Sequence, residues 1–405
     1  MGKRKFLKKV LERCLEGILT LSGGVTSLVI LLIVIFLFGE GATLFRQPNV
    51  ENGYALLVHP QNNVNNLSSK QIKDIFDEEV TQWTEVGGNH QDNIFPFRLS
   101  DLPNHVSIES LGSNFENAPR IIDSLILSRN DIIAFVPLSF VAPDGQARVL
   151  PEVPVSPRDF YLGDDWQPTA HPAAQFGVLP LVTGTLWVSL LAVLISLPFG
   201  LAVAIYLAEI ADERVRKWFK PLIELLAGIP SVVYGFFGLT VIVPLIQRSF
   251  GLPVGETVLA GSIVLAIMAL PTIITVAEDA MRTIPRTMKE ASLALGATHW
   301  QTIYRVVIPC AVSGITAAVV LGIGRAVGET MAVLMVTGNA AVIPHSILEP
   351  VRTIPATIAA ELGEAPKGGA HYEALFQLGG ILFIITLVIS ITVEIISARK
   401  KYNLL

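Results

Sequence analysis

Five long stretches of this sequence contain no charged residue. Each has 20 residues or more, and about 20 apolar residues are enough for a helix to cross the hydrocarbon core of a bilayer. A spanning segment must also satisfy its backbone hydrogen bonds internally, which an α-helix does. We therefore expect membrane-spanning helices in Ile18–Phe38, Pro172–Ala208, Leu225–Gln247, Thr257–Ala277 and Ala374–Val393.

A sixth stretch, Val306–Thr337, is equally apolar but contains Arg325 and Glu329. Ionisable residues within a span are costly, so they normally face a partner or a water-filled cavity. Two interpretations are open. The two residues line a path across the membrane, or, because residues four apart share one face of a helix, they form a structural pair whose charges neutralise each other. Small residues that let a facing helix approach closely favour the path, and they are Gly322, Gly324 and Gly328. The sequence thus predicts an all-α polytopic membrane protein with six transmembrane helices.

The positions of the basic residues predict the orientation of these spans. The loops 1–17, 209–224, 278–305 and 394–405 together hold 17 Lys and Arg, whereas residues 39–171 hold 8 against 18 acidic residues. Basic loops stay in the cytoplasm, so we expect both termini inside and residues 39–171 outside. The apolar run after the basic first residues is longer than the core of a signal peptide, which has about 7–15 residues, and we interpret it as a retained anchor.

Residues 39–171, called the insert below, are polar and rich in turn-forming residues. Ser68 and Ser69 precede apolar residues at helical spacing, and two short apolar runs, Asn93–Phe97 and Asp131–Val136, are typical of strands. We expect a small α/β unit. Five prolines within Pro151–Pro172 favour an irregular tether that returns the chain to the membrane. The chain then divides into a first helix (1–38), the insert (39–171) and a five-helix core (172–405).

The loop at residues 285–309 is the most informative segment between spans. Its first half is amphipathic, with apolar side chains that can pack on a partner or on the bilayer edge, and Gly296 is suited to end a helix in a left-handed conformation. From these properties alone, a helix that rests on lipid headgroups is an equal alternative to a helix that docks a soluble domain. The apolar residues are Met288, Leu293, Leu295 and Trp300.

The spacing in this loop resembles a known family. Glu290-Ala291-Ser292, three residues, Gly296, nine residues and a Val-x-Ile-Pro ending at Pro309 are similar to the EAA loop of ABC importer permeases. Ser292, Val306 and Ile308 replace residues of similar size. The resemblance implies that this loop forms a coupling helix that sits in a groove of a separate ATP-hydrolysing subunit. The implied docking residues are Glu290, Ala291, Ser292, Gly296 and Pro309.

Further motifs resemble the PstC-type permeases of phosphate importers. They are Gly228–Gly235, Leu270-Pro271-Thr272 and Gly322–Val333, which includes Gly-Glu-Thr-Met. The resemblance implies a multi-pass protein of the bacterial plasma membrane that moves inorganic phosphate past Arg325, Glu329 and Thr330. The implied partners are membrane lipid, a second, PstA-type permease, a PstB-type ATPase dimer that binds ATP and magnesium, and a PstS-type phosphate-binding protein outside the cell.

The insert is similar to part of such a phosphate-binding protein, from Leu67–Phe76 through Ser100-Asp101 to Asp131–Pro137. The Gly-Ser-Gly-Thr that should follow the Ser-Asp pair is replaced by Leu102–His105, and no glycine-rich anion loop precedes it. Several converging backbone N–H groups are needed to hold a phosphate. The insert is therefore interpreted as a docking or spacing module in preference to a phosphate site.

Several functions are disfavoured by what the sequence lacks. Without Gly-x-x-x-x-Gly-Lys-Ser/Thr, we expect no ATPase activity, and the scattered histidines and cysteines predict neither a metal site nor a bound cofactor. Basic residues do not alternate with aromatic ones, which argues against nucleic-acid binding. Two alternatives stay open: a permease for another oxyanion such as sulfate or molybdate, and a membrane-anchored phosphate sensor, which would not need the 285–309 loop.

Overall fold

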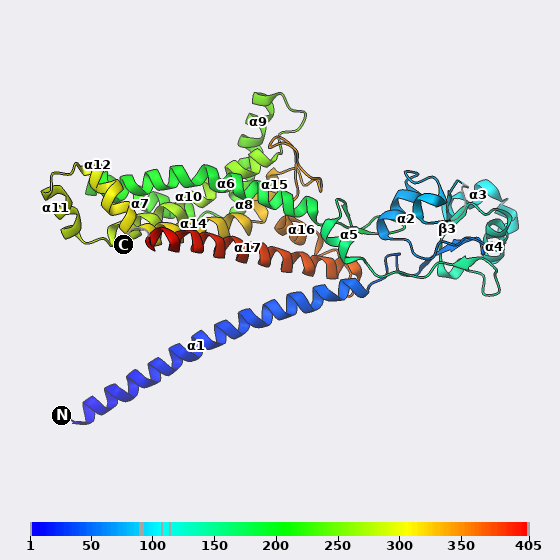
Figure 1. Ribbon diagram of the computed structural model, residues 1–405, viewed down its shortest axis with the longest axis horizontal. Helices are drawn as coiled ribbons and strands as arrows, with labels where there is room; N and C mark the ends of the chain where they lie inside the picture. Colours follow the sequence, from blue (N-terminus) through cyan, green and yellow to red (C-terminus); the bar gives the residue numbers. More distant parts are fainter. Residues whose placement is uncertain (1, 89–92, 107, 113–114, 403–405) are drawn as a thin grey trace.

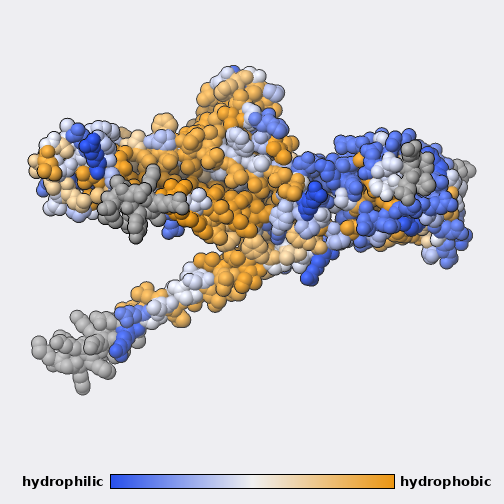
Figure 2. Space-filling view, viewed as in Figure 1, coloured by the Kyte–Doolittle hydropathy of each residue, from blue (hydrophilic) through white to orange (hydrophobic). Residues whose placement is uncertain are grey.

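The computed structural model describes residues 2–88, 93–106, 108–112 and 115–402. Long helices form an elongated bundle, the insert lies beyond one end of it, and α11 and α12 lie at the other end (Figure 1). The hydropathy of the surface follows the same division, since the bundle and most of α1 are apolar and the insert is largely hydrophilic (Figure 2). The molecule is therefore a membrane bundle with a polar unit at one end.

Five helices in the described part of the chain are long and apolar enough to cross a membrane, and a bent pair of helices makes a sixth candidate. This confirms the expected architecture. The uninterrupted helices are α1 (Gly2–Ala42), α6 (Leu179–Ile205, continued by the π-helical turn η6, Tyr206–Ile210), α10 (Val258–Arg282) and α17 (Ala370–Tyr402).

The third span begins later than Leu225. The amphipathic helix α7 (Glu213–Ala227) ends at Gly228, and the chain restarts as α8 (Ser231–Phe237), which continues through the π-helical turn η7 (Gly238–Ile242) into α9 (Val243–Phe250). Proline disfavours helical backbone in the residue before it, and Pro230 itself, with extended backbone, is the N-cap of α8. The spanning segment is Ser231–Phe250.

The sixth stretch is not one continuous helix. It enters through α12 (His299–Thr302), the π-helical turn η8 (Ile303–Val307) and α13 (Ile308–Cys310), then bends by 70° into α14 (Val312–Val327). The helix ends at Gly328, and the short α15 (Met331–Val336) starts anew after Thr330. The break therefore falls within the segment that carries the expected path residues.

Helices α6, α10 and α14 form the centre of the bundle. Gly200 of α6 and Gly322 of α14 both face Ile273 of α10, and a Cβ atom at either glycine would lie 2.8 Å from that side chain. Ser262 Oγ of α10 donates to the backbone oxygen of Val188 in α6 at 3.1 Å. These close contacts make the three helices a packed unit. In contrast, α1 diverges from the bundle and contacts α17 near its own end (Figure 1).

The insert contains a four-stranded sheet in the order β2-β3-β1-β4. Strands β1 (Tyr54–Val58) and β3 (Ile132–Pro137) are antiparallel, and β2 (Phe95–Arg98) is parallel to β3. Strand β4 (Arg148–Val149) pairs with β1 in antiparallel orientation. The expected helix is α2 (Ser69–Phe76), which a capping box between Ser68 and Gln71 begins. Both expected strands are confirmed. The shorter elements of the insert are η2 (Trp83–Val86), η3 (Leu99–Asp101), α3 (Leu102–His105), η4 (Ile108–Leu111), α4 (Ala118–Ser128) and η5 (Leu138–Phe140).

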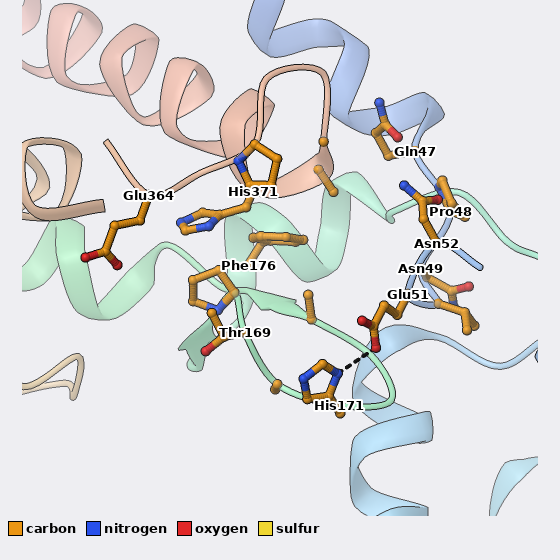
Figure 3. A pocket seen from close by; sticks show the side chains of 17 residues that line it. Gln47, Pro48, Asn49, Glu51, Asn52, Thr169, His171, Phe176, Glu364 and His371 are labelled. Atoms are coloured by element: carbon orange, nitrogen blue, oxygen red, sulfur yellow. Dashed lines mark hydrogen bonds and ion pairs between the residues drawn. The ribbon is translucent and has the colours of Figure 1, made fainter. Parts of the chain in front are cut away.

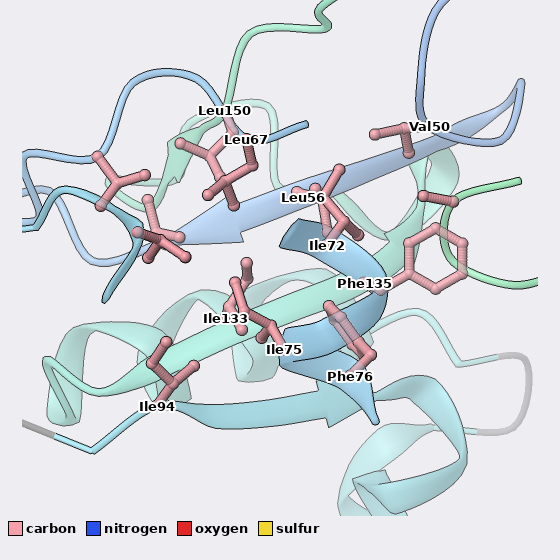
Figure 4. Close-up of a cluster of buried hydrophobic side chains, with 14 of the residues drawn as sticks. Val50, Leu56, Leu67, Ile72, Ile75, Phe76, Ile94, Ile133, Phe135 and Leu150 are labelled. Carbon is pink, nitrogen blue, oxygen red and sulfur yellow. The ribbon is translucent and has the colours of Figure 1, made fainter. Parts of the chain in front are cut away.

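Strand β3 is buried on both faces. Ile133 and Phe135 contribute to the core that α2 covers (Figure 4), while Ile132, Ala134 and Val136 pack on the opposite side together with residues of α4. Successive strand residues point to opposite faces, so one strand serves both cores. This sandwich of helix, sheet and helix gives the insert a hydrophobic interior of its own.

The expectation of an irregular tether at Pro151–Pro172 is wrong. This segment forms α5 (Pro157–Leu162) and β5 (Trp166–Gln167), which pairs with β6 (Gln175–Phe176). Phe160 and Trp166 are buried in a hydrophobic core with Leu44 of the turn η1 (Thr43–Arg46) and residues of α17. Apolar residues between the prolines thus anchor the base of the insert on the bundle.

The two segments that lead into and out of the sheet of the insert lie side by side next to this base. Pro48 and Pro154 form an antiparallel bridge, and the backbone N–H of Asn49 donates to the oxygen of Val153 at 2.9 Å. These two strands form a narrow neck between the base and the sheet of the insert. Lys70 and Lys73 of α2 also pair with Asp164 and Asp165 of the base, at 3.2 and 3.3 Å.

Candidate functional site

Arg325 lies in the last turn of α14 and is half-buried in the bundle. Its Nη1 donates to Thr272 Oγ1 of α10 at 3.3 Å, and no carboxylate oxygen in the described part of the chain lies within 4.0 Å of the guanidinium. A guanidinium has five N–H donors in a fixed planar arrangement. Most of the donor capacity of Arg325 is therefore left for water or for a bound anion.

Glu329 and Thr330 lie outside the helix that carries Arg325. The expectation that Arg325 and Glu329 share one helical face is wrong, because α14 ends at Val327. Glu329 Oε1 instead accepts from the backbone N–H of Ala332 at 3.4 Å, at the start of α15, and Thr330 Oγ1 donates to the oxygen of Gly328 at 3.4 Å. The structure brings the three residues to one break in the span without pairing the two charges.

The three glycines of this segment do not have one common role. Gly322 packs tightly against Ile273, as small residues at helix contacts do. A Cβ atom at Gly324 would meet nothing within 4 Å, and one at Gly328 would approach only the backbone oxygen of Gly324. Close helix contact is thus confirmed for Gly322 alone.

The 285–309 loop forms an exposed helical projection at the end of the bundle opposite the insert (Figure 1). Glu290 and Ala291 are exposed on α11 (Arg286–Ala294), which ends where Gly296 adopts the expected left-handed conformation with φ +84°. Leu295 is 90% exposed. Exposed apolar side chains at such a tip are typical of a surface that another protein or the bilayer covers.

Three polar contacts hold the loop in place. Lys289 Nζ lies 2.6 Å from Oε1 of Glu209, whose side chain is 5% exposed, and His299 Nε2 lies 3.1 Å from the backbone oxygen of the same residue. Ser292 Oγ and Thr302 Oγ1 are 3.0 Å apart. Of the expected docking residues, Ser292 therefore faces inward, and Pro309 lies away from the tip, in α13.

A second buried carboxylate ties α7 to the end of α10. The side chain of Glu278 is 1% exposed and lies 2.9 Å from Arg216, 3.5 Å from Lys220 and 3.6 Å from Arg282. Burial alone would lower the pKa of Lys220, but the carboxylates of Asp279 and Glu278 raise it above its ordinary value. This cluster keeps α7 positively charged on its inner side and fixed to the bundle.

At the opposite end, Glu361 joins the insert to the bundle. It ends α16 (Ile354–Glu361) and lies 2.6 Å from Arg352 and 2.9 Å from His371, and it accepts from Nε1 of Trp166 at 3.0 Å. Burial raises the pKa of Glu361, but the hydrogen bonds from His371 and Trp166 and the charge of Arg352 outweigh it and lower this pKa.

A cleft of about 520 Å³ lies beside this contact, between the neck of the insert and the start of α17 (Figure 3). Polar and apolar residues both line it, and His171 Nδ1 lies 2.6 Å from Glu51 Oε2 across one corner. In the described residues, no group of three or more His, Cys, Asp or Glu side chains could hold a metal ion. The cleft lies at the junction between the insert and the bundle.

The Ser-Asp pair of the insert is occupied by local contacts. Asp101 Oδ2 accepts from the backbone N–H of Arg98 at 2.9 Å, and Ser100 Oγ lies 3.5 Å from the other carboxylate oxygen. The helix that follows, α3, has only four residues. The structure shows no set of converging backbone donors at Asp101 among the residues it describes.

Sequence reasoning missed Glu209, Glu278 and the role of Thr272. A signal was present for the two carboxylates, because each is the first charged residue after an apolar stretch, at Ala208 and at Ala277. Their partners, however, come from distant segments. Thr272 belongs to a motif that the sequence identified, but its contact with α14 depends on how the helices pack.

A bundle of apolar helices, one of them broken, with an exposed loop at one end defines a class: a multi-span helical membrane protein. The chain belongs to the family described as binding-protein-dependent transport system inner membrane component, which matches residues 196–402. It is thus a multi-pass protein of the inner membrane.

The chain is also similar to individual bacterial permeases. The chain is 42% identical over 247 residues to the probable ABC transporter permease protein YqgH of Bacillus subtilis, covering 61% of this chain and 80% of that protein. It is 39% identical over 249 residues to the phosphate transport system permease protein PstC of Mesorhizobium japonicum, covering 57% and 75%. A solved structure of the MetNI methionine ABC transporter covers 55% of this chain and 96% of its own, with 20% identity and a TM-score of 0.41.

Proposed function

We propose that this chain is a transmembrane permease subunit of an ATP-driven importer for inorganic phosphate. In this proposal it forms the translocation path with a second, homologous permease of the PstA type, and a PstB-type ATPase dimer hydrolyses ATP. A PstS-type binding protein delivers phosphate from outside the cell. The names of the PstC relatives and the match to the permease family support this function.

The observation that carries the proposal is the state of Arg325. A permanent cation within a span, with one hydroxyl partner and no carboxylate within 4.0 Å in the described part of the chain, is a site for a passing anion. Arginine stays charged at all physiological pH values and donates two parallel hydrogen bonds to phosphate oxygens. Thr272 orients the guanidinium without neutralising it.

Glu329 and Thr330 lie where the helix is interrupted, and they complete the proposed path. Glu329 is held at the start of α15 by a weak backbone contact, so a modest movement of the break brings its carboxylate toward Arg325 when the anion leaves. Such competition for the guanidinium prevents the site from becoming a trap. Irregular backbone at membrane depth is tolerated where it lines a cavity, which agrees with this placement.

The exposed tip of the 285–309 loop is the proposed docking surface for the ATPase, through Glu290, Ala291 and Gly296. This places α11 and both termini in the cytoplasm and the insert outside. The distribution of the 17 basic residues supports this orientation.

The insert, in this proposal, guides or spaces the binding protein and does not hold phosphate itself. Its 18 acidic against 8 basic residues create a field that repels the anion, and the local contacts of Asp101 leave no cradle. Asp101→Asn in the complete complex should therefore leave the phosphate concentration for half-maximal uptake unchanged. A shift of about tenfold or more would contradict this role of the insert.

The experiment that tests the function is anion-stimulated ATP hydrolysis by the complex reconstituted in phospholipid vesicles, compared across phosphate, sulfate and molybdate with a binding protein present. We expect stimulation and uptake with phosphate alone. Stimulation by sulfate or molybdate would favour the other oxyanions, and an assembled complex that moves no anion would favour a sensor.

A further inference from the structure

Glu209 lies where the 285–309 loop meets the membrane bundle. It belongs to η6, the π-helical turn that follows α6, and its side chain is 5% exposed. A buried carboxylate is costly unless a cation or hydrogen-bond donors accompany it. Lys289 supplies the cation at 2.6 Å from the middle of α11, and with a side chain 21% exposed it is itself largely covered. Glu209 and Lys289 therefore form a largely buried ion pair.

Both arms of the loop contact this one residue. Lys289 comes before the left-handed turn of the loop and His299 after it, yet the first contacts the carboxylate of Glu209 and the second its backbone oxygen. The hydrogen bond between Ser292 and Thr302 joins the two arms to each other. The two arms are therefore joined to each other, and both make polar contacts with Glu209 in the turn after α6. Val307, near the end of the loop, also belongs to one hydrophobic core with Ala204 and Leu207.

From Glu209, packed helices lead to the proposed path. Helix α6 packs along α10, and Ser262 of α10 bonds to the backbone of α6 at Val188. Helix α10 also carries Thr272, the hydroxyl partner of Arg325. Because close-packed helices transmit movement as rigid elements, we expect a displacement of Glu209 to shift α6 and α10 together. A π-helical turn at the attachment point is a local distortion of a kind that is frequent at functional sites.

We propose that Glu209 is a positioning residue for the coupling of ATP hydrolysis to transport. Through Lys289 and His299 it attaches the loop to α6, and a displacement of the loop reaches the helix pair that holds Thr272. This inference rests on the proposed docking of an ATPase to the outer surface of the loop. The inner surface, with Lys289, transmits the movement.

The test uses the complete complex, reconstituted in phospholipid vesicles with the binding protein present. Three quantities are measured: the ATPase that co-purifies, the rate of ATP hydrolysis, and the phosphate taken up per ATP hydrolysed. Glu209→Gln keeps the size of the side chain and removes its charge, and Lys289→Met keeps the apolar stem. We expect each to lower uptake per ATP about tenfold, a typical coupling for residues in direct contact, with unchanged co-purification and hydrolysis.

Two further variants separate positioning from general stability. Lys289→Arg keeps a cation within reach of Glu209 and should retain most of the uptake per ATP. The matched control is Lys217→Met, which breaks the exposed pair with Glu213, whose atoms are 3.8 Å apart and whose side chains are 78% and 87% exposed; it should change nothing.

Wild-type uptake per ATP in Glu209→Gln and Lys289→Met would overturn the inference, as would equal loss in Lys289→Arg and Lys289→Met. If the two disruptive variants lost the ATPase, the pair would serve docking alone, which overturns the coupling role but leaves the proposed function intact. Failure of the wild-type chain to retain an ATPase would instead overturn the proposed function.

Discussion

Two charged side chains within the helical bundle have opposite surroundings. Glu278 of α10 is 1% exposed and is met by cations on three sides, from Arg216, Lys220 and Arg282. Arg325 of α14 has Thr272 as its one hydrogen-bond partner among the described residues. The first charge is fully compensated within the chain, and the second keeps donors for a ligand. Burial of a charge therefore does not by itself mark a ligand site here; unused hydrogen-bonding capacity does.

The largest effect is expected for Arg325→Gln, which tests whether this uncompensated cation acts in transport. We expect uptake of phosphate to fall roughly 100-fold or more, because charge-assisted hydrogen bonds contribute about 1.5–3 kcal/mol each and two are lost. Assembly, followed by co-purification of the partner subunits, should be unchanged. Under a structural-pair interpretation, Arg325→Gln together with Glu329→Gln would recover transport, and such recovery would refute the role of Arg325 on the path.

The docking surface depends on backbone conformation more than on charge. Gly296→Val forces a β-branched residue to φ +84°, at a cost of about 1–3 kcal/mol. We expect the amount of co-purified ATPase to drop about tenfold. Gly296→Asn is the matched control, since asparagine tolerates this conformation better, and a Cβ atom there meets nothing within 4 Å. Equal co-purification of the valine variant would contradict the docking assignment.

Removal of a cation that compensates Glu278 should lower the stability of the chain. Arg216→Met leaves Glu278 with two weaker cation contacts, and we expect a loss of about 2 kcal/mol in the free energy of unfolding, below the cost of a wholly broken buried pair. Thermal unfolding of the purified chain in detergent measures it, with Lys217→Met as the exposed control. Should uptake per assembled complex fall without any loss of stability, the contrast with Arg325 would disappear.

Two glycines of α14 test how the helix that carries Arg325 packs. Gly322→Ala places a Cβ atom 2.8 Å from Ile273 and should lower stability by about 1–2 kcal/mol through overpacking. Gly324→Ala meets open space and should keep or slightly raise stability, because alanine favours helix. The same thermal measurement decides, and equal effects of the two changes would show that the packing around α14 is wrong.

The smallest expected effect concerns Glu361, the compensated charge at the insert. Its pKa is lowered in the folded state, so its contribution to stability is present above the ordinary value of 4.5 and is lost as pH falls through the folded pKa. Glu361→Gln should cost about 1 kcal/mol at pH 7, and its difference from wild type should shrink below pH 4.5. A difference that persists undiminished in acid would show that the carboxylate's charge is irrelevant to this contact.

The sequence predicts well wherever the governing interactions are local. The capping box at Ser68 and Gln71, the left-handed Gly296 and the apolar spans all follow from residues within one helix or turn. Interruptions of helices were harder to see. The continuous apolar run through Gly328 hides the break after Val327, because hydropathy does not distinguish a helix from a kinked chain.

What could not be predicted depends on segments far apart in the sequence. Lys289 pairs with Glu209, which is 80 residues away in the sequence. Trp166 donates a hydrogen bond to Glu361, which is 195 residues away. The proline-rich Pro151–Pro172 segment became a packed base because Phe160 and Trp166 bury against α17 and η1, which composition alone does not show. The roles proposed for Arg325, Glu329, Thr330 and the docking residues stay predictions.

The narrow neck at Pro48 and Pro154 has a consequence for how such a chain is assembled from parts. Its two strands are already paired through Asn49 and Val153, so a short turn could replace everything beyond them, with loss of the contacts that α2 makes to Asp164 and Asp165. A unit whose ends adjoin can be acquired or discarded by a single recombination event in the gene. The membrane helices need not evolve in step with the polar unit that they carry.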